Sequence, residues 1–169
     1  EGPKNVKLAA DECDGWLPMF YSPHCPEIFD ESLANKSSDF EIAASVPIFI
    51  NDNVDEALLN VKMMLALYLG GMGAKSENFH QNLIKRMGFG EEAKVVQDLW
   101  YAGDKEAAVK AVPDQLADDI SLCGPEGRIK ERLEAWHKSP VTTMLFMRTE
   151  NAEEDKQRLR TYADLILNR

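Results

Sequence analysis

The residues best suited to chemistry include a glycine directly before an expected helix. Gly2 precedes Pro3, and proline is favoured at the first helical position because its missing N–H costs nothing there. A glycine at a helix start lets an anion approach closely, while the free N–H groups and the helix dipole favour a phosphate. Gly2 and Pro3 are therefore candidate cofactor-binding residues.

A second polar group follows the apolar run at 16–20. Tyr21 and Ser22 carry hydroxyl groups that could hydrogen-bond to a phosphate or to other parts of a cofactor, although Ser22-Pro23 is equally typical of a turn. His24 is a candidate proton donor or substrate contact, because an imidazole titrates near neutral pH. The alternative for His24 is an ordinary loop histidine.

Neither a metal site nor a nucleotide loop is indicated. His24 and Cys25 are adjacent, but no other His or Cys lies at ligand spacing, and we expect His80 and His137 on helix surfaces. The run GGMG at 70–73 is not followed by the Gly-Lys-Ser/Thr of a P-loop, so by itself it predicts the end of a helix.

The composition limits the class of protein. With 169 residues, 44% of them hydrophobic and 28% charged, the chain is typical of a globular domain and not of a disordered, collagen-like or coiled-coil protein. A net charge of -10 disfavours nucleic acid and anionic membranes as partners, and no uncharged stretch reaches the ~18 residues of a spanning helix. Three cysteines without a C-x-x-C spacing indicate a cytoplasmic location.

Apolar periodicity predicts the elements that position these residues. We expect strands near 15–20, 40–50 and 141–147, a helical insertion near 70–120, and further helices at about 3–13, around Ile28, Phe29 and Leu33, and at 52–70, 125–136 and 152–167. In the run FEIAASVPIFI one face is wholly apolar and much of the other face is apolar too, as in an inner strand of a parallel sheet.

The order of these elements predicts an α/β fold. Strands alternating with helices pair in parallel through right-handed crossovers, yet three strands leave two unpaired edges and the chain starts on a helix. We therefore expect one partial domain over 1–169, the C-terminal part of a (β/α)8 TIM barrel, with the preceding strands upstream of Glu1. The active-site face of such a barrel, at the carboxyl ends of the strands, then includes Gly2, the loop 21–24, Asn51, Asp52 and residues 148–149.

Several runs resemble a known superfamily. The run GPKNVKLAADECDGWLP at 2–18 resembles a helix and strand of luciferase-like monooxygenase barrels. The run 64–74, with Asn78-Phe79, is similar to the branch of deazaflavin (coenzyme F420)-dependent oxidoreductases. The remaining matching residues are Val112, Pro113, Asp114, Leu122, Gly124, Pro125, Ile129, Arg132, Val141, Thr142 and Thr143.

The resemblance carries its own expectations about the site. It implies that the chain holds the sixth to eighth strands of the barrel, and that the cofactor phosphate binds at the Gly2-Pro3 turn. Residues 70–79 would belong to the insertion that roofs the pocket, so Met72, Lys75 and Phe79 are substrate-side candidates. The usual catalytic residues lie in the upstream half, so none is assigned here.

The implied function is hydride transfer between coenzyme F420 and a small organic substrate by the full-length protein. A flavin mononucleotide (FMN)-dependent monooxygenase is one alternative, and a non-catalytic barrel half or subunit is another. Similar enzymes are often homodimers. We expect residues 1–169 alone to be poorly soluble and inactive, because missing strands would leave apolar edges.

Overall fold

The apolar segment at 40–50 supplies the central strand of a parallel sheet. In the computed structural model, which describes residues 2–73, 77–147 and 151–167, β2 (Glu41–Ser45) lies between β1 (Gly15–Trp16) and β5 (Thr143–Leu145). Both pairings are parallel. The α/β class with parallel strands is confirmed, because each strand returns to the sheet only after at least one helix.

Two prolines make the strands shorter than expected. The strand expected at 15–20 is paired only at Gly15–Trp16, because Pro18 has no N–H to donate and Phe20 adopts a left-handed conformation with φ 58°. The strand expected at 40–50 is divided at Pro47. The N–H of Val46 donates to Leu145 O at 3.0 Å, and beyond the proline β3 (Ile48–Ile50) takes a different partner.

That partner is β4 (Leu122–Gly124), a strand that the sequence did not predict. The two strands are parallel, with Phe49 opposite Cys123. Three residues are too few to show a period of two, and all three are buried, so the segment gives no alternating pattern.

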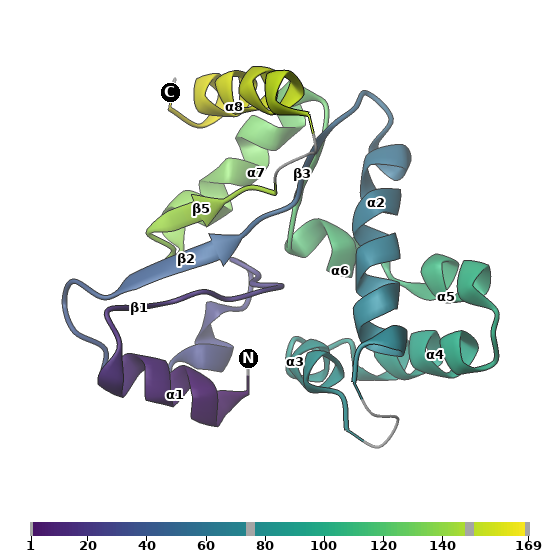
Figure 1. Cartoon of the computed structure of the whole chain (residues 1–169), viewed down its shortest axis with the longest axis horizontal. Helices are drawn as coiled ribbons and strands as arrows, with labels where there is room; N and C mark the ends of the chain where they lie inside the picture. Colours follow the sequence, from purple (N-terminus) through teal and green to yellow (C-terminus); the bar gives the residue numbers. More distant parts are fainter. Residues whose placement is uncertain (1, 74–76, 148–150, 168–169) are drawn as a thin grey trace.

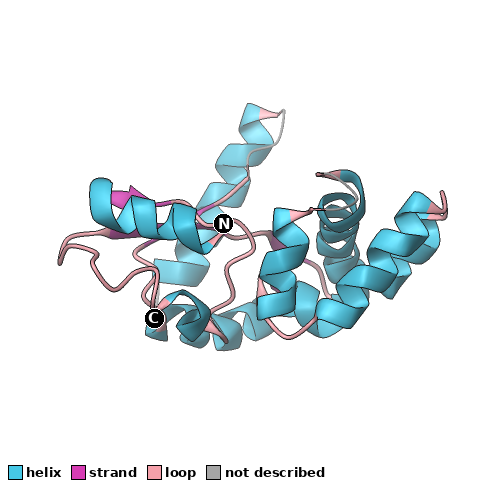
Figure 2. Cartoon of the chain, turned by 90° about the horizontal axis from the view of Figure 1, so that it is seen from below, coloured by secondary structure: helices cyan, strands magenta, loops and turns pink. Residues whose placement is uncertain are grey.

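Helices make up most of the described chain (Figure 2). Their bounds are α1 (Pro3–Glu12), the 3-10 helix η1 (Pro26–Phe29), α2 (Val54–Ala66), the π-helix η2 (Leu67–Gly71), α3 (Phe79–Arg86), α4 (Gly90–Tyr101), α5 (Lys105–Ala111), α6 (Asp114–Asp119), α7 (Glu126–Lys138) and α8 (Ala152–Leu167). The helix expected around Phe29 and Leu33 is thus only a short 3-10 turn.

The helices form two groups around the sheet. Figure 1 shows α1 below the strands, α7 and α8 above them, and α2 to α5 beyond the end of β2. One face of the sheet is buried against the first group, with Trp16, Ile42 and Ala44 all less than 10% exposed. The second group lies at the carboxyl ends of the strands, where a parallel α/β fold places its binding sites.

Candidate functional site

The N-terminus of α1 is built to attract an anion. Gly2 is its N-cap and Pro3 its first residue, and within the described residues this helix has neither a capping side chain nor an acidic residue in its first turn. By contrast, Asn53, Asn78 and Asp104 cap α2, α3 and α5 with their side chains. No atom lies within 4 Å of the position that a Cβ on Gly2 would take, so a ligand can reach the backbone there.

A cavity of about 680 Å³ lies between this helix start and α3. We call it the α1–α3 cavity; its lining residues are Gly2, Pro3, Lys4, Asn5, Phe79, His80, Asn82 and Arg86. The structure therefore brings together three of the predicted residues, Gly2, Pro3 and Phe79, from segments more than 70 positions apart. Their roles in binding remain predictions.

The charged residues in the described lining of this cavity are basic, although the chain as a whole is acidic. Lys4 and Arg86 contribute two cations, and none of the described lining residues is Asp or Glu. The chain as a whole has a net charge of -10. A local excess of cations beside a helix N-terminus favours a ligand with anionic groups.

Asn78 sets the orientation of α3 against the cavity. Its buried side chain accepts from the N–H groups of His80 and Gln81 at 2.9 and 3.1 Å, which caps the helix. Its amide also donates to Tyr68 O at 2.9 Å and to Leu69 O at 3.0 Å. Four hydrogen bonds from one side chain therefore fix the start of α3 to the end of the long helix before it.

His80 belongs to an aromatic cluster at one wall of the cavity. Its ring meets Tyr68 edge-on, with 4.7 Å between centroids, and Phe20 at 5.7 Å. His80 lies on helix α3, as expected, but two aromatic rings half-bury its side chain. The left-handed backbone of Phe20 turns that ring toward α3, and such strained residues often gather near binding sites.

Arg86 is partly withdrawn from water at the far end of α3. Its guanidinium carbon lies 5.5 Å from the centroid of Phe29, and Nη1 donates to Ile28 O at 3.5 Å. Burial lowers the pKa of Arg86, although an arginine stays protonated at neutral pH. Neither Arg86 nor Asn82 was proposed from the sequence; the signal was the spacing of positions 79, 82 and 86, which share one helical face.

Tyr21 and Ser22 lie away from this cavity. Tyr21 is only 1% exposed and stacks on Phe29, and burial raises the pKa of its hydroxyl. Ser22 is also buried, and its hydroxyl accepts from the N–H of His24 at 3.1 Å. Their side chains thus stabilise the core and the turn, and cofactor binding by these two residues remains a prediction.

The other substrate-side candidates are also separate from the cavity. His24 is exposed and lies near Asp119. Burial raises the pKa of the Asp119 carboxyl group, and the nearby His24 partly offsets this rise. Met72 is exposed and does not line the α1–α3 cavity. Lys75 lies outside the described residues.

The GGMG run has a packing function. A Cβ on Gly70 would collide with the Cβ and Cγ of Trp100, and one on Gly71 would come within 3.2 Å of the same indole. The two glycines therefore let the π-helix η2 lie directly against α4.

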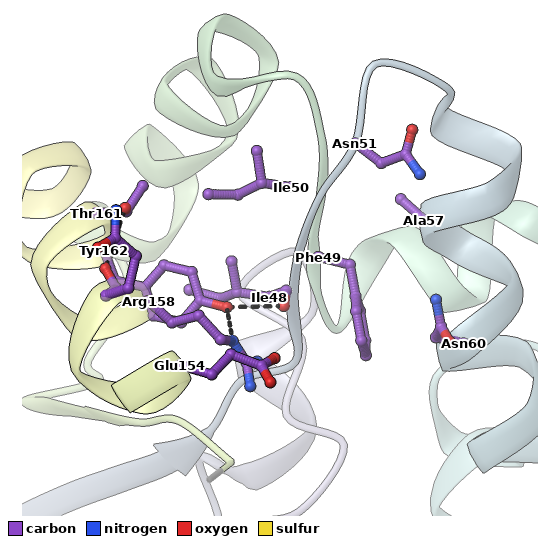
Figure 3. Close-up of a pocket in the computed structure, with 11 residues that line it drawn as sticks. Ile48, Phe49, Ile50, Asn51, Ala57, Asn60, Glu154, Arg158, Thr161 and Tyr162 are labelled. Atoms are coloured by element: carbon purple, nitrogen blue, oxygen red, sulfur yellow. Dashed lines mark hydrogen bonds between the residues drawn. The ribbon is translucent and has the colours of Figure 1, made fainter. Parts of the chain in front are cut away.

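A second cavity, of about 460 Å³, lies between α8 and β3 (Figure 3). Two of its polar side chains are already paired: the Tyr162 hydroxyl donates to Ile48 O at 3.2 Å and accepts from Arg158 Nε at 3.2 Å. Glu154 and Arg158 both line it, so it lacks the one-sided charge of the α1–α3 cavity. In the described residues no three His, Cys, Asp or Glu side chains could hold a metal ion together.

Comparison with known proteins identifies the family. The family model described as luciferase-like monooxygenase matches residues 1–143. The chain belongs to this family. Both runs quoted for the resemblance, and all of its further residues from Val112 to Thr143, lie within that range.

Two relatives show how much of the family fold is present. The chain is 40% identical over 154 residues to a Mycobacterium tuberculosis protein provisionally named a coenzyme F420-dependent oxidoreductase, covering 86% of this chain and 44% of that one. It is 25% identical over 157 residues to the 5,10-methylenetetrahydromethanopterin reductase of Archaeoglobus fulgidus, covering 86% and 45%. This chain spans about half the length of the relatives it matches.

Solved structures of the luciferase-like family share the fold. The coenzyme F420-dependent tetrahydromethanopterin reductase of Methanopyrus kandleri has a TM-score of 0.65 at 20% identity, over 85% of this chain and 42% of that one. An F420-dependent secondary alcohol dehydrogenase, in complex with an F420–acetone adduct, has a TM-score of 0.60 at 12% identity, over 98% and 46%. The fold is therefore that of a part of these luciferase-like TIM barrels.

Proposed function

We propose that this chain is part of a coenzyme F420-dependent oxidoreductase and holds the phosphate end of the cofactor at the N-terminus of α1. The observation that carries the proposal is the uncapped start of α1, which opens into a cavity with two cations and no described acidic residue. The relatives named for F420 support the choice of cofactor.

The residues present fit such a group. Gly2 leaves the backbone accessible, Lys4 adds a positive charge at the helix start, and Pro3 fixes the first turn without removing a needed N–H donor. When bound, reduced F420 supplies a hydride for a small organic substrate. The part of this chain is to bind and orient the cofactor and to wall off one side of the substrate cavity with α3.

FMN remains the second candidate. It also ends in a phosphate, so the open start of α1 would serve it equally well. Titrating the full-length protein with each cofactor, followed by fluorescence, decides between them. Tight FMN binding without F420 binding would exclude the first proposal, and binding of neither would favour a non-catalytic subunit.

Lys4→Glu tests the phosphate site with two readouts of opposite sign. An acidic residue in the first turn of α1 should raise the stability of the fold by about 0.3–1 kcal/mol, because it complements the helix dipole. The same change should weaken F420 binding roughly tenfold, because it repels the phosphate. Stability is measured by thermal unfolding and the Kd by fluorescence titration of the full-length protein.

Lys36→Glu is the matched control, since Lys36 is an exposed lysine in a turn that does not line the cavity. It makes the same change in net charge and should leave the Kd within twofold. If both variants weakened binding equally, the effect would be one of overall charge, and the proposed phosphate site would be wrong.

The cellular location and the oligomeric state are also proposals. We infer a cytoplasmic protein, which the three free cysteines Cys13, Cys25 and Cys123 support. Among the described helices, none has the length and apolar content needed to cross a bilayer. A homodimer without nucleic acid or membrane partners is likewise proposed, and sedimentation of the full-length protein tests it.

A further inference from the structure

The α1–α3 cavity continues from the open start of α1 to one face of α3. We propose that this part of the cavity binds the tail that coenzyme F420 carries beyond its phosphate, with Phe79 and Asn82 as the binding residues on α3. The inference rests on the proposed function, because it starts from a phosphate at Gly2. It also gives the site a reason to prefer F420 to FMN.

The two candidate cofactors differ on the far side of the phosphate. In FMN the phosphate is a monoester and ends the molecule. In F420 the phosphate is a diester, and its second ester bond leads to a lactyl group and a chain of glutamyl residues. When the phosphate is held by the N–H groups at the start of α1, only F420 has a further group to place in the rest of the cavity.

The cavity is large enough for such a tail. Its volume is about 680 Å³, which lies within the usual range for pockets that enclose small organic ligands, so a phosphate fills only part of it. Four of its lining residues, Gly2 to Asn5, belong to the start of α1, and the other four belong to α3. A group that is attached to a phosphate at Gly2 and enters this cavity therefore lies against α3.

Phe79 and Asn82 share the cavity face of α3. They are three residues apart, which places them on one side of the helix and about 4.5 Å apart along its axis. The side chain of Phe79 is 60% exposed, whereas Leu83 and Ile84 of the same helix are buried in the core. An exposed ring on this face covers the methylene groups of a glutamyl residue and removes them from water.

Carboxamide groups line the cavity from both helices. Asn5 belongs to α1 and Asn82 to α3, and within the described parts of the chain neither side chain forms a hydrogen bond. A carboxamide both donates and accepts hydrogen bonds, so it pairs with the amide groups and with the carboxylates of a glutamyl chain. The described lining contains no Asp or Glu that would repel these carboxylates, although the chain has a net charge of -10.

The binding face is fixed by residues that lie behind it. The side chain of Asn78 caps α3 and donates to two carbonyl groups of η2. Arg86 has no part in the proposed binding, since its guanidinium already contacts the ring of Phe29 and the carbonyl of Ile28. Because this wall is held in place before a ligand arrives, little binding energy is lost in ordering it.

The assignment also defines the role of α3 toward the substrate. The sequence placed Phe79 among the substrate-side candidates, whereas the proposed tail site places it against the cofactor. With the tail bound, α3 and the cofactor together close this side of the substrate cavity.

A series of three ligands tests the proposal in the full-length protein. They are the deazaflavin compound that ends before the phosphate, F420 without glutamyl residues, and F420 with two glutamyl residues. The phosphate should lower the Kd between the first ligand and the second, as the proposed function requires. The glutamyl residues should lower the Kd about tenfold between the second and the third, as one or two hydrogen bonds do. Quenching of deazaflavin fluorescence gives each Kd.

The double variant Phe79→Ala and Asn82→Ala should lose this tenfold gain and should bind F420 without glutamyl residues within twofold of the wild type. Both side chains are exposed, so the variant should fold, and thermal unfolding confirms it. The double variant Val95→Ala and Gln115→Ala is the matched control. It removes one exposed apolar side chain and one exposed amide that do not line the cavity, and it should keep the gain.

Failure of the inference and failure of the proposed function give different results. If the wild type bound both forms of F420 with one Kd, or if the Phe79 and Asn82 variant kept the tenfold gain, the inference would be wrong while the phosphate site stood. If the phosphate gave no gain in affinity, or if F420 did not bind, the proposed function would fail as well. Unchanged F420 binding by this variant, together with a raised KM for the substrate, would assign the cavity to the substrate and overturn the inference.

Discussion

Gly70 shows how a residue that looks functional in the sequence can be structural. The GGMG run supported the resemblance to F420-dependent oxidoreductases, and in the structure Gly70 and Gly71 are the surface on which Trp100 lies. The indole is also covered by Lys105, whose Nζ is 5.2 Å from the ring centroid. A motif typical of a family can therefore arise from the packing that holds a helical insertion together.

Gly70→Ala should destabilise the fold. The added methyl group would overlap Trp100, so the indole and α4 must shift, at a cost of about 1–3 kcal/mol in the free energy of unfolding. Chemical denaturation of the full-length protein measures this cost. Gly127→Ala in α7 is the control: nothing lies within 4 Å of its new methyl group, so it should be neutral or stabilising by up to about 1 kcal/mol. Equal stability of the Gly70 variant and the wild type would contradict the packing function.

At the scale of elements, the helices were predicted better than the strands. Helices α2 and α8 have regular apolar stripes and were expected close to their observed bounds. The strands differ because local chemistry overrides their apolar pattern: Pro47 divides one strand, and Phe20 turns the chain away from another. β4 is buried on every side and only three residues long, so it has no periodicity to detect.

The candidate site was predicted only in part for a related reason. Gly2 and Pro3 could be proposed because a helix start is local in sequence. The opposing face of α3 is set by Asn78, through bonds to Tyr68 and Leu69 that depend on the tertiary fold. A pattern in the sequence could place Phe79 and Arg86 on one face, but only the structure shows that this face lies opposite α1.

Asn78→Ala should loosen α3 as a unit. The variant loses the helix cap and the two bonds to backbone carbonyls, and we expect a loss of about 2–4 kcal/mol in the free energy of unfolding. Because α3 forms one wall of the α1–α3 cavity, the full-length protein should also bind F420 more weakly.

Asn53→Ala is the matched control for this prediction. Asn53 caps α2 but is exposed, and among the described residues its side-chain hydrogen bonds reach only Asp55 and Glu56. Its loss should therefore cost only about 1 kcal/mol and should not affect F420 binding. Native-state hydrogen exchange at α3 compares the two variants. Protection of α3 as high in Asn78→Ala as in the wild type would show that other contacts, and not Asn78, hold this helix.

At the scale of the molecule, the sheet has one covered face and one open face. The parallel register puts Trp16, Ile42 and Ala44 on the buried side. Leu17, Leu145 and Met147 alternate with these positions and are 71%, 36% and 63% exposed. In the described residues β1 and β5 each pair on one side only.

This open face leads to a prediction about residues 1–169 studied alone. Exposed apolar side chains beside two unpaired strand edges favour self-association, so we expect concentration-dependent oligomers and binding of a hydrophobic dye. The double variant Leu17→Lys and Met147→Lys should reduce both self-association and dye binding, because charge on this face opposes edge-to-edge pairing.

Leu8→Lys is the control, since Leu8 is 59% exposed but lies on α1, away from the open face. Sedimentation velocity and dye fluorescence provide the measurements. A wild-type sample that stayed monodisperse, bound no dye and unfolded cooperatively would show that residues 1–169 are self-sufficient and that the open face needs no cover.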